Sequence, residues 1–158
     1  MYTRHLKLYV ISIICFILDL FSKFVIVNTL DYEEELTVIK NFFSIFYIRN
    51  TGAAFGMFSS HTVLLTIITL LIIYVFIKHV NKNKFNTLEE VSYGLIFGGA
   101  VGNLFDRIIN GYVIDFFSFN IFGYSFPVFN VADICVVIGV FLLIIINFGG
   151  LYGKDKTR

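Results

Sequence analysis

Charged residues are scarce in this sequence and account for only 15% of its 158 residues. Hydrophobic residues make up 58% and aromatic residues 18%, and the mean hydropathy is +0.84. A soluble domain of this size needs more charge to cover its surface, whereas a protein embedded in a bilayer does not. The composition therefore predicts an integral membrane protein.

Other absences exclude several classes of function. The formal net charge is only +1, so the composition predicts no nucleic-acid partner. The two cysteines, Cys15 and Cys135, are far apart within apolar runs, which counts against a disulfide oxidoreductase with paired thiols. The sequence has no Gly-x-Ser-x-Gly segment and no Cys/His metal spacing, and its three histidines lie outside the apolar spans. A rhomboid-like Ser/His site therefore has little support, and a zinc site has none.

Four apolar segments are long enough to cross a bilayer as helices, since each crossing needs about 20 residues. We expect these transmembrane helices at about 8–27, 61–80, 88–110 and 131–148. Thr87 and Glu90 form a capping-box pattern at the start of the third segment, and Asn110-Gly111 predicts its end. The whole chain, 1–158, is expected to form one membrane domain, all-α apart from a small β-element.

The distribution of basic residues predicts the orientation of these helices. Eight of the twelve lysines and arginines lie before the first segment, from the end of the second segment to the start of the third, or after the fourth. The stretch between the first and second segments instead carries the acidic run Asp31, Glu33, Glu34 and Glu35. By the positive-inside rule, both termini are expected in the cytoplasm.

Two segments on the outer side are expected to have other structures. Residues 31–60 are rich in β-forming side chains and predict a small extracytoplasmic sheet against the membrane surface. Residues 116–127 are aromatic and poor in charge, which predicts an interfacial helix or flap at headgroup depth.

The third apolar segment has a glycine at every fourth position. Gly94, Gly98 and Gly102 form a small-xxx-small face, which predicts close approach of a neighbouring helix. Such packing also brings the polar residues that follow Gly102 near the other helices, namely Asn103, Asp106 and Arg107.

Ionisable residues at membrane depth are costly and are therefore candidates for function. Asp19 and Lys23 are four residues apart on one helix face, where they form either a structural pair or a part of a substrate site. Asp106 and Arg107 are adjacent and point apart. We expect Arg107 to hold a carboxylate or a backbone carbonyl in place.

Asp115 and Asp133 differ from these because neither has a basic residue nearby in the sequence. Each is expected where a loop meets a helix at the outer membrane surface. Two carboxyl groups brought together there share one proton, which is the requirement of aspartyl proteolysis. The alternative is two separate helix caps, above all for Asp133 near a helix start. Spacing alone leaves both interpretations open.

Five motifs occur in a fixed order along most of the chain. They are Asp19-Leu20-Phe21-Ser22-Lys23, Asn50-Thr51-Gly52-Ala53-Ala54-Phe55-Gly56, Gly102-Asn103-Leu104-Phe105-Asp106-Arg107, Val113-Ile114-Asp115-Phe116 and Phe129-Asn130-Val131-Ala132-Asp133. In these motifs the sequence resembles the bacterial lipoprotein signal peptidases, or signal peptidase II. It departs from the commonest pattern of that family at Leu20, Ser22, Ile134 and Cys135, and it has no tryptophan.

The resemblance implies an aspartyl endopeptidase that removes the signal peptide from diacylglyceryl-modified prolipoproteins, cutting before the lipidated cysteine. It implies that Asp115 and Asp133 are the catalytic pair. The supporting residues that it implies, or that lie in the same motifs, are Asp19, Lys23, Asn50, Gly52, Asn103, Asp106, Arg107 and Asn130.

The resemblance also implies a location and a set of partners. The protein is expected in the bacterial cytoplasmic membrane as a multi-pass monomer, with its site toward the extracytoplasmic side. Its partners are prolipoprotein substrates and membrane lipid, and neither a metal nor an organic cofactor is expected.

Two alternative functions remain open on the sequence. A small carboxylate-dependent transporter would place its acids near the bilayer midplane, where only Asp19 is expected. A non-catalytic scaffold would use the glycine-rich helix for packing alone.

Overall fold

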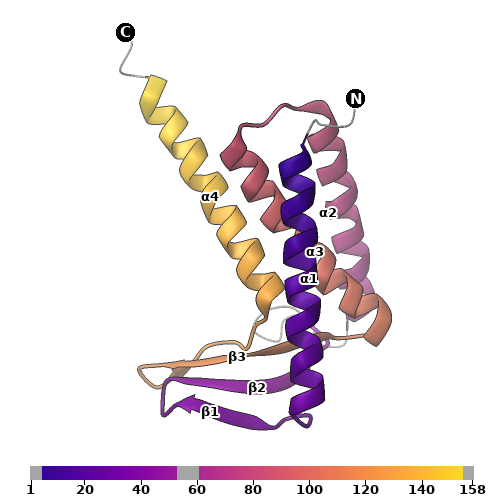
Figure 1. Cartoon of the computed structure of the whole chain (residues 1–158), viewed down its shortest axis with the longest axis vertical. Helices are drawn as coiled ribbons and strands as arrows, with labels where there is room; N and C mark the ends of the chain where they lie inside the picture. The colour runs from indigo at the N-terminus through magenta and orange to yellow at the C-terminus, as the bar shows by residue number, and fades with distance from the viewer. Residues whose placement is uncertain (1–4, 53–60, 155–158) are drawn as a thin grey trace.

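Four helices and a small sheet make up the computed structural model of the chain, which describes residues 5–52 and 61–154. The helices are α1 (Leu6–Thr29), α2 (Thr62–Lys82), α3 (Thr87–Asn110) and α4 (Val131–Lys154). Figure 1 shows them extending from one end of the molecule, with the sheet across the other. They lie at the four segments expected from the sequence, and α4 continues beyond residue 148.

Three helices in the described part of the chain are long and apolar enough to cross a membrane: Leu6–Thr29, Thr62–Lys82 and Val131–Phe148. The remaining helix, α3, is as long as α1, with 24 residues. It carries the polar residues Asn103, Asp106 and Arg107 in its last two turns. It packs against the other three helices (Figure 1), and Asp106 is buried. Its polar residues are therefore accommodated by protein.

The glycines of α3 allow this packing, as the sequence predicts. A Cβ atom added at Gly98 would lie 2.6 Å from the carbonyl oxygen of Ser12, and one at Gly94 would lie 2.8 Å from that of Leu8. Gly99 faces the backbone of Ala132 in α4 in the same way. The backbones of α1 and α4 thus approach α3 as closely as a helix without side chains permits.

The start of α3 differs from the expected one. Asn86 is the N-cap: its Oδ1 accepts from the Glu89 backbone N–H at 2.9 Å, and Glu89 Oε2 accepts from the Asn86 N–H at 2.7 Å. The predicted Thr87–Glu90 box was wrong by one residue. Asparagine is preferred over threonine as an N-cap, and Asn86 directly precedes Thr87. The helix ends at Gly111, whose φ of 79° provides the expected stop.

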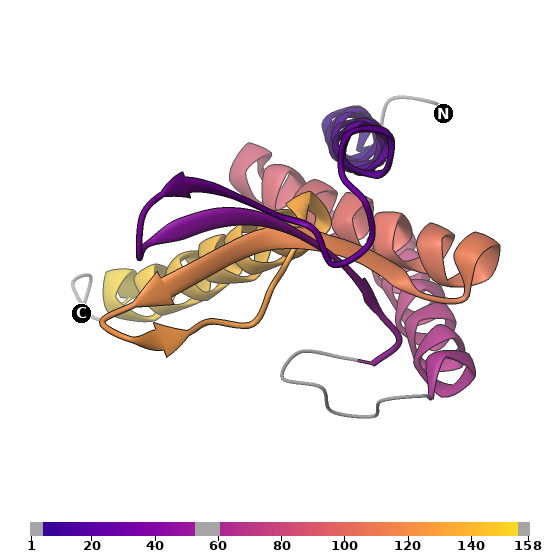
Figure 2. The ribbon, with the colours of Figure 1, turned by 90° about the horizontal axis from the view of Figure 1, so that it is seen from below.

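The sheet is antiparallel and has the order β1-β2-β3-β4. Its strands are β1 (Glu35–Ile39), β2 (Phe43–Asn50), β3 (Val113–Ile121) and β4 (Tyr124–Ser125). Seen from below in Figure 2, they lie across the ends of the helices. The predicted sheet in 31–60 is therefore present as far as Asn50, and 53–60 lie outside the described residues.

The interfacial helix considered for 116–127 was wrong. Residues up to Ile121 continue β3, and Phe117 and Phe119 pair with Ile45 and Phe43 of β2. The Phe43 and Phe119 rings stack with centroids 4.7 Å apart. Such cross-strand aromatic pairs stabilise a sheet, and a helix lying alone at the interface cannot form them.

A small apolar cluster fixes the sheet to the helices. Ile26 near the end of α1 packs with Tyr47 of β2 and with Ile114 and Phe116 of β3. Ile114 and Phe116 flank Asp115 in the sequence, so this cluster also sets the position of the strand segment that carries Asp115.

Candidate active site

A buried lysine of α1 contacts two carboxylates. Lys23 Nζ is 2.7 Å from Asp19 Oδ2 and 2.9 Å from Asp106 Oδ2, and it donates to Asn103 Oδ1 at 3.2 Å. The lysine and both aspartates are buried. The pairing of Asp19 with Lys23 follows from their spacing, whereas the contact with Asp106 joins α1 to α3 and has no local signal in the sequence.

The two carboxylates in turn hold backbone groups on other elements. Asp19 Oδ1 accepts from the Ala132 N–H at 2.9 Å, at the start of α4. Asp106 Oδ2 accepts from the Ile114 N–H at 3.1 Å, in β3. Ala132 directly precedes Asp133 and Ile114 directly precedes Asp115, so each bond positions the backbone next to one of these aspartates.

Glycine at position 102 makes room for this arrangement. A Cβ atom added at Gly102 would lie 2.5 Å from Asp19 Oδ2 and 3.4 Å from the Ala132 side chain. The Asp19 carboxylate can therefore reach both Lys23 and α4 only because α3 has no side chain at this point.

Asp115 lies within strand β3, opposite Ile48 of β2, and not at the junction of a loop and a helix that the sequence analysis expected. The register of β2 and β3 is irregular between Ile45 and Ile48, just before this pair. Asp115 Oδ2 accepts from Asn50 Nδ2 at 2.8 Å, and Oδ1 accepts from Asn130 Nδ2 at 2.6 Å. The residue is 2% exposed.

Asp133 lies in the first turn of α4. Its Oδ1 accepts from Asn103 Nδ2 at 2.7 Å, and its Oδ2 accepts from the Asn130 N–H at 3.2 Å. Asn130 Oδ1 accepts from the Asp133 N–H at 2.9 Å, so the two residues form a reciprocal cap. The helix-cap interpretation of Asp133 is thus correct, and the same carboxylate also faces the site.

Asn130 joins the two aspartates. It is fully buried, its side-chain amide donates to Asp115, and its backbone N–H donates to Asp133. The same amide donates to Asn103 Oδ1 at 3.0 Å, and Asn103 in turn donates to Asp133. The two carboxyl groups are therefore held in one hydrogen-bonded unit. In the sequence, the Asn-x-x-Asp spacing predicts only a helix cap.

The two carboxyl groups have different environments. Burial, followed by the negative charge of nearby Asp133, raises the pKa of Asp115 to about 7, although the hydrogen bonds from Asn50 and Asn130 act in the opposite direction. Near neutral pH, Asp115 therefore holds a proton for part of the time. One protonated and one ionised carboxyl group can act together as an acid and a base.

Both aspartates line a cavity of about 540 Å³. Asn50, Gly52 and Arg107 lie at the same polar end of it. The Gly52 N–H donates to Asn50 Oδ1 at 2.9 Å, which leaves the Asn50 amide free to face Asp115. Arg107 donates to the Asn103 carbonyl oxygen at 3.3 Å, one of its two expected roles. The structure thus brings together all ten residues singled out from the sequence.

The apolar wall of this cavity was missed by the sequence analysis. It is formed by Ile134, Val136, Val137 and Ile138 of α4, opposite the segment 126–129. Only the end of the expected flap, Phe126 and Pro127, therefore reaches the cavity. In the sequence these α4 residues are part of an unbroken apolar run, so nothing distinguishes the ones that line the cavity from those that face lipid.

Comparison with known proteins identifies the family of the chain. The model of the family described as signal peptidase (SPase) II matches residues 11–148. The chain belongs to this family. Signal peptidase II enzymes are membrane aspartic peptidases, so the resemblance seen in the five motifs is confirmed and the chain is a hydrolase.

Individual signal peptidase II relatives are similar over most of their length. A lipoprotein signal peptidase of Staphylococcus haemolyticus (strain JCSC1435) is 41% identical over 137 residues, which cover 86% of this chain and 87% of that one. A lipoprotein signal peptidase of Staphylococcus aureus (strain JH9) is 42% identical over 139 residues, covering 85% of this chain and 83% of the relative.

Two solved structures share the fold. Both are described as bacterial membrane enzymes determined by the in meso method, at 2.3 Å and 1.9 Å resolution. The first has a TM-score of 0.82 at 37% identity and covers 94% of this chain and 90% of its own. The second has a TM-score of 0.77 at 39% identity, with coverages of 86% and 88%.

Replacing Lys23 by methionine tests its role in this site. The change leaves two buried carboxylates without their cation, which is expected to cost about 3–5 kcal/mol in the free energy of unfolding. Thermal unfolding of the purified protein in detergent measures the loss. The matched control is Lys40→Met, at an exposed position in the turn between β1 and β2. Equal unfolding temperatures for the two variants would contradict the role of Lys23.

Proposed function

We propose that the chain removes the signal peptide from diacylglyceryl-modified prolipoproteins, with Asp115 and Asp133 as the catalytic pair. The observation that carries this proposal is the bridge by Asn130, which holds both carboxyl groups in one unit at the edge of a single cavity. The relatives that share 39–42% identity with the chain are lipoprotein signal peptidases.

The different environments of the two carboxyl groups support a division of roles. Ionised Asp133 removes a proton from water as the water oxygen bonds to the scissile carbonyl carbon, while protonated Asp115 donates a hydrogen bond to the carbonyl oxygen. The proton held by Asp133 then passes to the leaving nitrogen as the carbon–nitrogen bond breaks. Asp115 is the acid because its site is the more buried one.

The other polar residues support the pair at two distances. Asn50, Gly52 and Arg107 line the cavity. Their role in this proposal is to contact the substrate backbone. Asn103 and Asn130 orient the two carboxyl groups. The deeper residues Asp19, Lys23 and Asp106 fix the backbone that carries them.

The apolar wall of the cavity fits a lipidated substrate. It runs along α4 from Ile134, beside Asp133, to Val137 and Ile138, both of which are exposed on the helix surface. Since α4 is apolar enough to cross a membrane, an acyl chain in the bilayer can lie along this wall. The diacylglyceryl group then places the peptide bond to be cut at the polar end.

All four helices cross the membrane in this proposal, within one domain and with both termini in the cytoplasm. The connection between α2 and α3 lies at the end of the molecule opposite the sheet (Figure 1). Lys78 and Lys82 are in the last two turns of α2, and Lys84 is in this connection. The positive-inside rule puts that end in the cytoplasm and the site on the outer side. A fluorescent protein fused after Arg158 should therefore fold in the cytoplasm and emit. A fusion that does not fluoresce would contradict the proposed orientation.

Substituting either aspartate by asparagine should abolish cleavage. Asp115→Asn removes the acid and Asp133→Asn removes the base, and we expect losses in kcat of at least about 10²–10⁴-fold. Release of signal peptide from a lipidated precursor in liposomes measures the rate, with Asp31→Asn as the control at an exposed aspartate. Near wild-type rates in either site variant would show that the pair is wrong.

The rate should fall as the pH rises through about 7, where Asp115 loses its proton. The hydrogen bond from Asn50 favours the ionised form of Asp115, so Asn50→Ala should raise this pKa and move the alkaline limb of kcat/KM to higher pH. Asn28→Ala, at an exposed position near the end of α1, should leave the limb in place. An alkaline limb that stays or moves to lower pH in Asn50→Ala would contradict the assignment of Asp115.

A further inference from the structure

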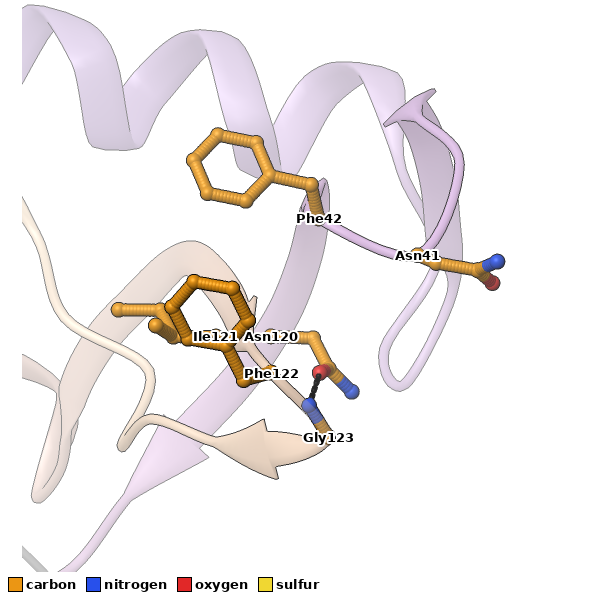
Figure 3. Close-up of a pocket in the computed structure, with 6 residues that line it drawn as sticks. All are labelled: Asn41, Phe42, Asn120, Ile121, Phe122 and Gly123. Carbon is orange, nitrogen blue, oxygen red and sulfur yellow. Dashed lines mark hydrogen bonds between the residues drawn. The ribbon is translucent and has the colours of Figure 1, made fainter.

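The end of the sheet away from α1 carries two adjacent turns, visible together in Figure 2. One joins β1 to β2 and the other joins β3 to β4. A groove of about 560 Å³ lies between them, and Figure 3 shows the residues that line it: Asn41, Phe42, Asn120, Ile121, Phe122 and Gly123. We call residues 39–42 and 120–124 the hairpin tip.

The turn between β3 and β4 has an unfavourable residue in its first central position. Ile121 pairs with Tyr124, and the two residues between them have φ angles of 52° for Phe122 and 86° for Gly123. A two-residue turn with two positive φ angles strongly favours Asn-Gly, because a bulky side chain is strained there. Asn120 Oδ1 accepts from the Gly123 N–H at 2.9 Å and holds the turn closed.

The strained residue gains no compensating burial from the protein, since Phe122 is fully exposed, at 106%. Other exposed apolar residues surround it on the tip: Ile39, Phe42, Ile121 and Tyr124. A residue that strains its backbone and gains no burial in return is a candidate for a role in binding rather than in folding. An aromatic ring in water at the end of a hairpin is suited to an apolar partner.

The hairpin tip lies at the depth of a bilayer surface. Helix α1 has 24 residues and is therefore about 36 Å long, against about 30 Å for the hydrocarbon core. The sheet is fixed to Ile26, in the last turn of this helix, and β3 extends sideways from there past the end of α4 (Figure 1). The tip therefore overhangs the lipid that surrounds the helices, at the level of the headgroups.

The charges on the β1–β2 hairpin are arranged in the same sense. The acidic residues Asp31, Glu33, Glu34 and Glu35 lie at its α1 end, whereas the charged residue at the tip is the exposed Lys40. A cation beside apolar side chains suits anionic phospholipid headgroups, which repel an acidic end.

We propose that the hairpin tip inserts into the headgroup layer of the phospholipid bilayer, with the Phe122 ring at the boundary with the acyl chains. Aromatic rings are enriched at this depth. The contact fixes the far end of the sheet against the membrane, so β3 is held at both ends: by Ile26 at one and by lipid at the other. Asp115 then keeps a constant height relative to a substrate anchored in the same bilayer.

Single tryptophan substitutions test this contact directly, because the chain has no tryptophan of its own. The full-length Phe122→Trp variant is reconstituted into phospholipid vesicles with and without brominated lipid. The control is Thr37→Trp, at an exposed position of β1, which Figure 1 shows farther from the helices than β3. We expect brominated lipid to quench the tryptophan at position 122 at least about twice as strongly as the one at position 37. The tryptophan at position 122 should also be less accessible to iodide.

Equal quenching by brominated lipid at positions 122 and 37 would overturn the proposal. A blue-shifted emission at position 122 without quenching by lipid would also overturn it, since the ring would then be covered by a second protein chain. If Phe122→Trp does not fold, Phe42→Trp carries the same expectation. The readout does not depend on peptide cleavage, so a negative result would leave the proposed peptidase function standing.

Discussion

The contact of Lys23 with two buried carboxylates is the constraint on which the site depends. An unpaired charge is very costly at this depth, so neither aspartate is stable there without the lysine, nor the lysine without them. Each carboxylate also accepts a backbone N–H, from Ala132 in one case and Ile114 in the other. One ion cluster therefore joins α1 and α3 to the two segments that carry Asp133 and Asp115.

In this arrangement the residues that hold the backbone are separate from the two aspartates that we propose as catalytic. Lys23 pairs with Asp19 and Asp106. The proposed catalytic pair is instead held mainly by neutral asparagine amides. A cation paired directly with Asp115 would stabilise its ionised form and lower its pKa. Amide donors position the same carboxyl group more weakly in this respect, so burial and Asp133 keep its pKa near 7.

The local features of the chain were predictable from the sequence, and the long-range ones were not. Hydropathy located the helices, glycine spacing predicted the close contact along α3, and the i,i+4 spacing predicted the pairing of Asp19 with Lys23. The contact between Lys23 and Asp106 arises only when α1 packs on α3, so no short-range pattern contains it.

The failures have physical reasons of the same kind. Residues 116–121 are aromatic enough for an interface, but pairing with β2 makes them a strand. The Asn-x-x-Asp spacing at the start of α4 indicates a cap, and only the fold shows that Asn130 also reaches Asp115. The apolar wall of the cavity is invisible in a helix that is apolar on every side.

The most direct test of the central claim is to measure the protonation state of the Asp115 carboxyl group as a function of pH. Carbon-13 NMR of the intact protein, labelled at aspartate, makes this measurement. Ordinary aspartates are ionised above about pH 5. The account predicts one carboxyl signal that stays protonated beyond this range, titrates near pH 7 and is missing from Asp115→Asn. Complete ionisation of Asp115 by about pH 5 would contradict the division of roles between the two aspartates.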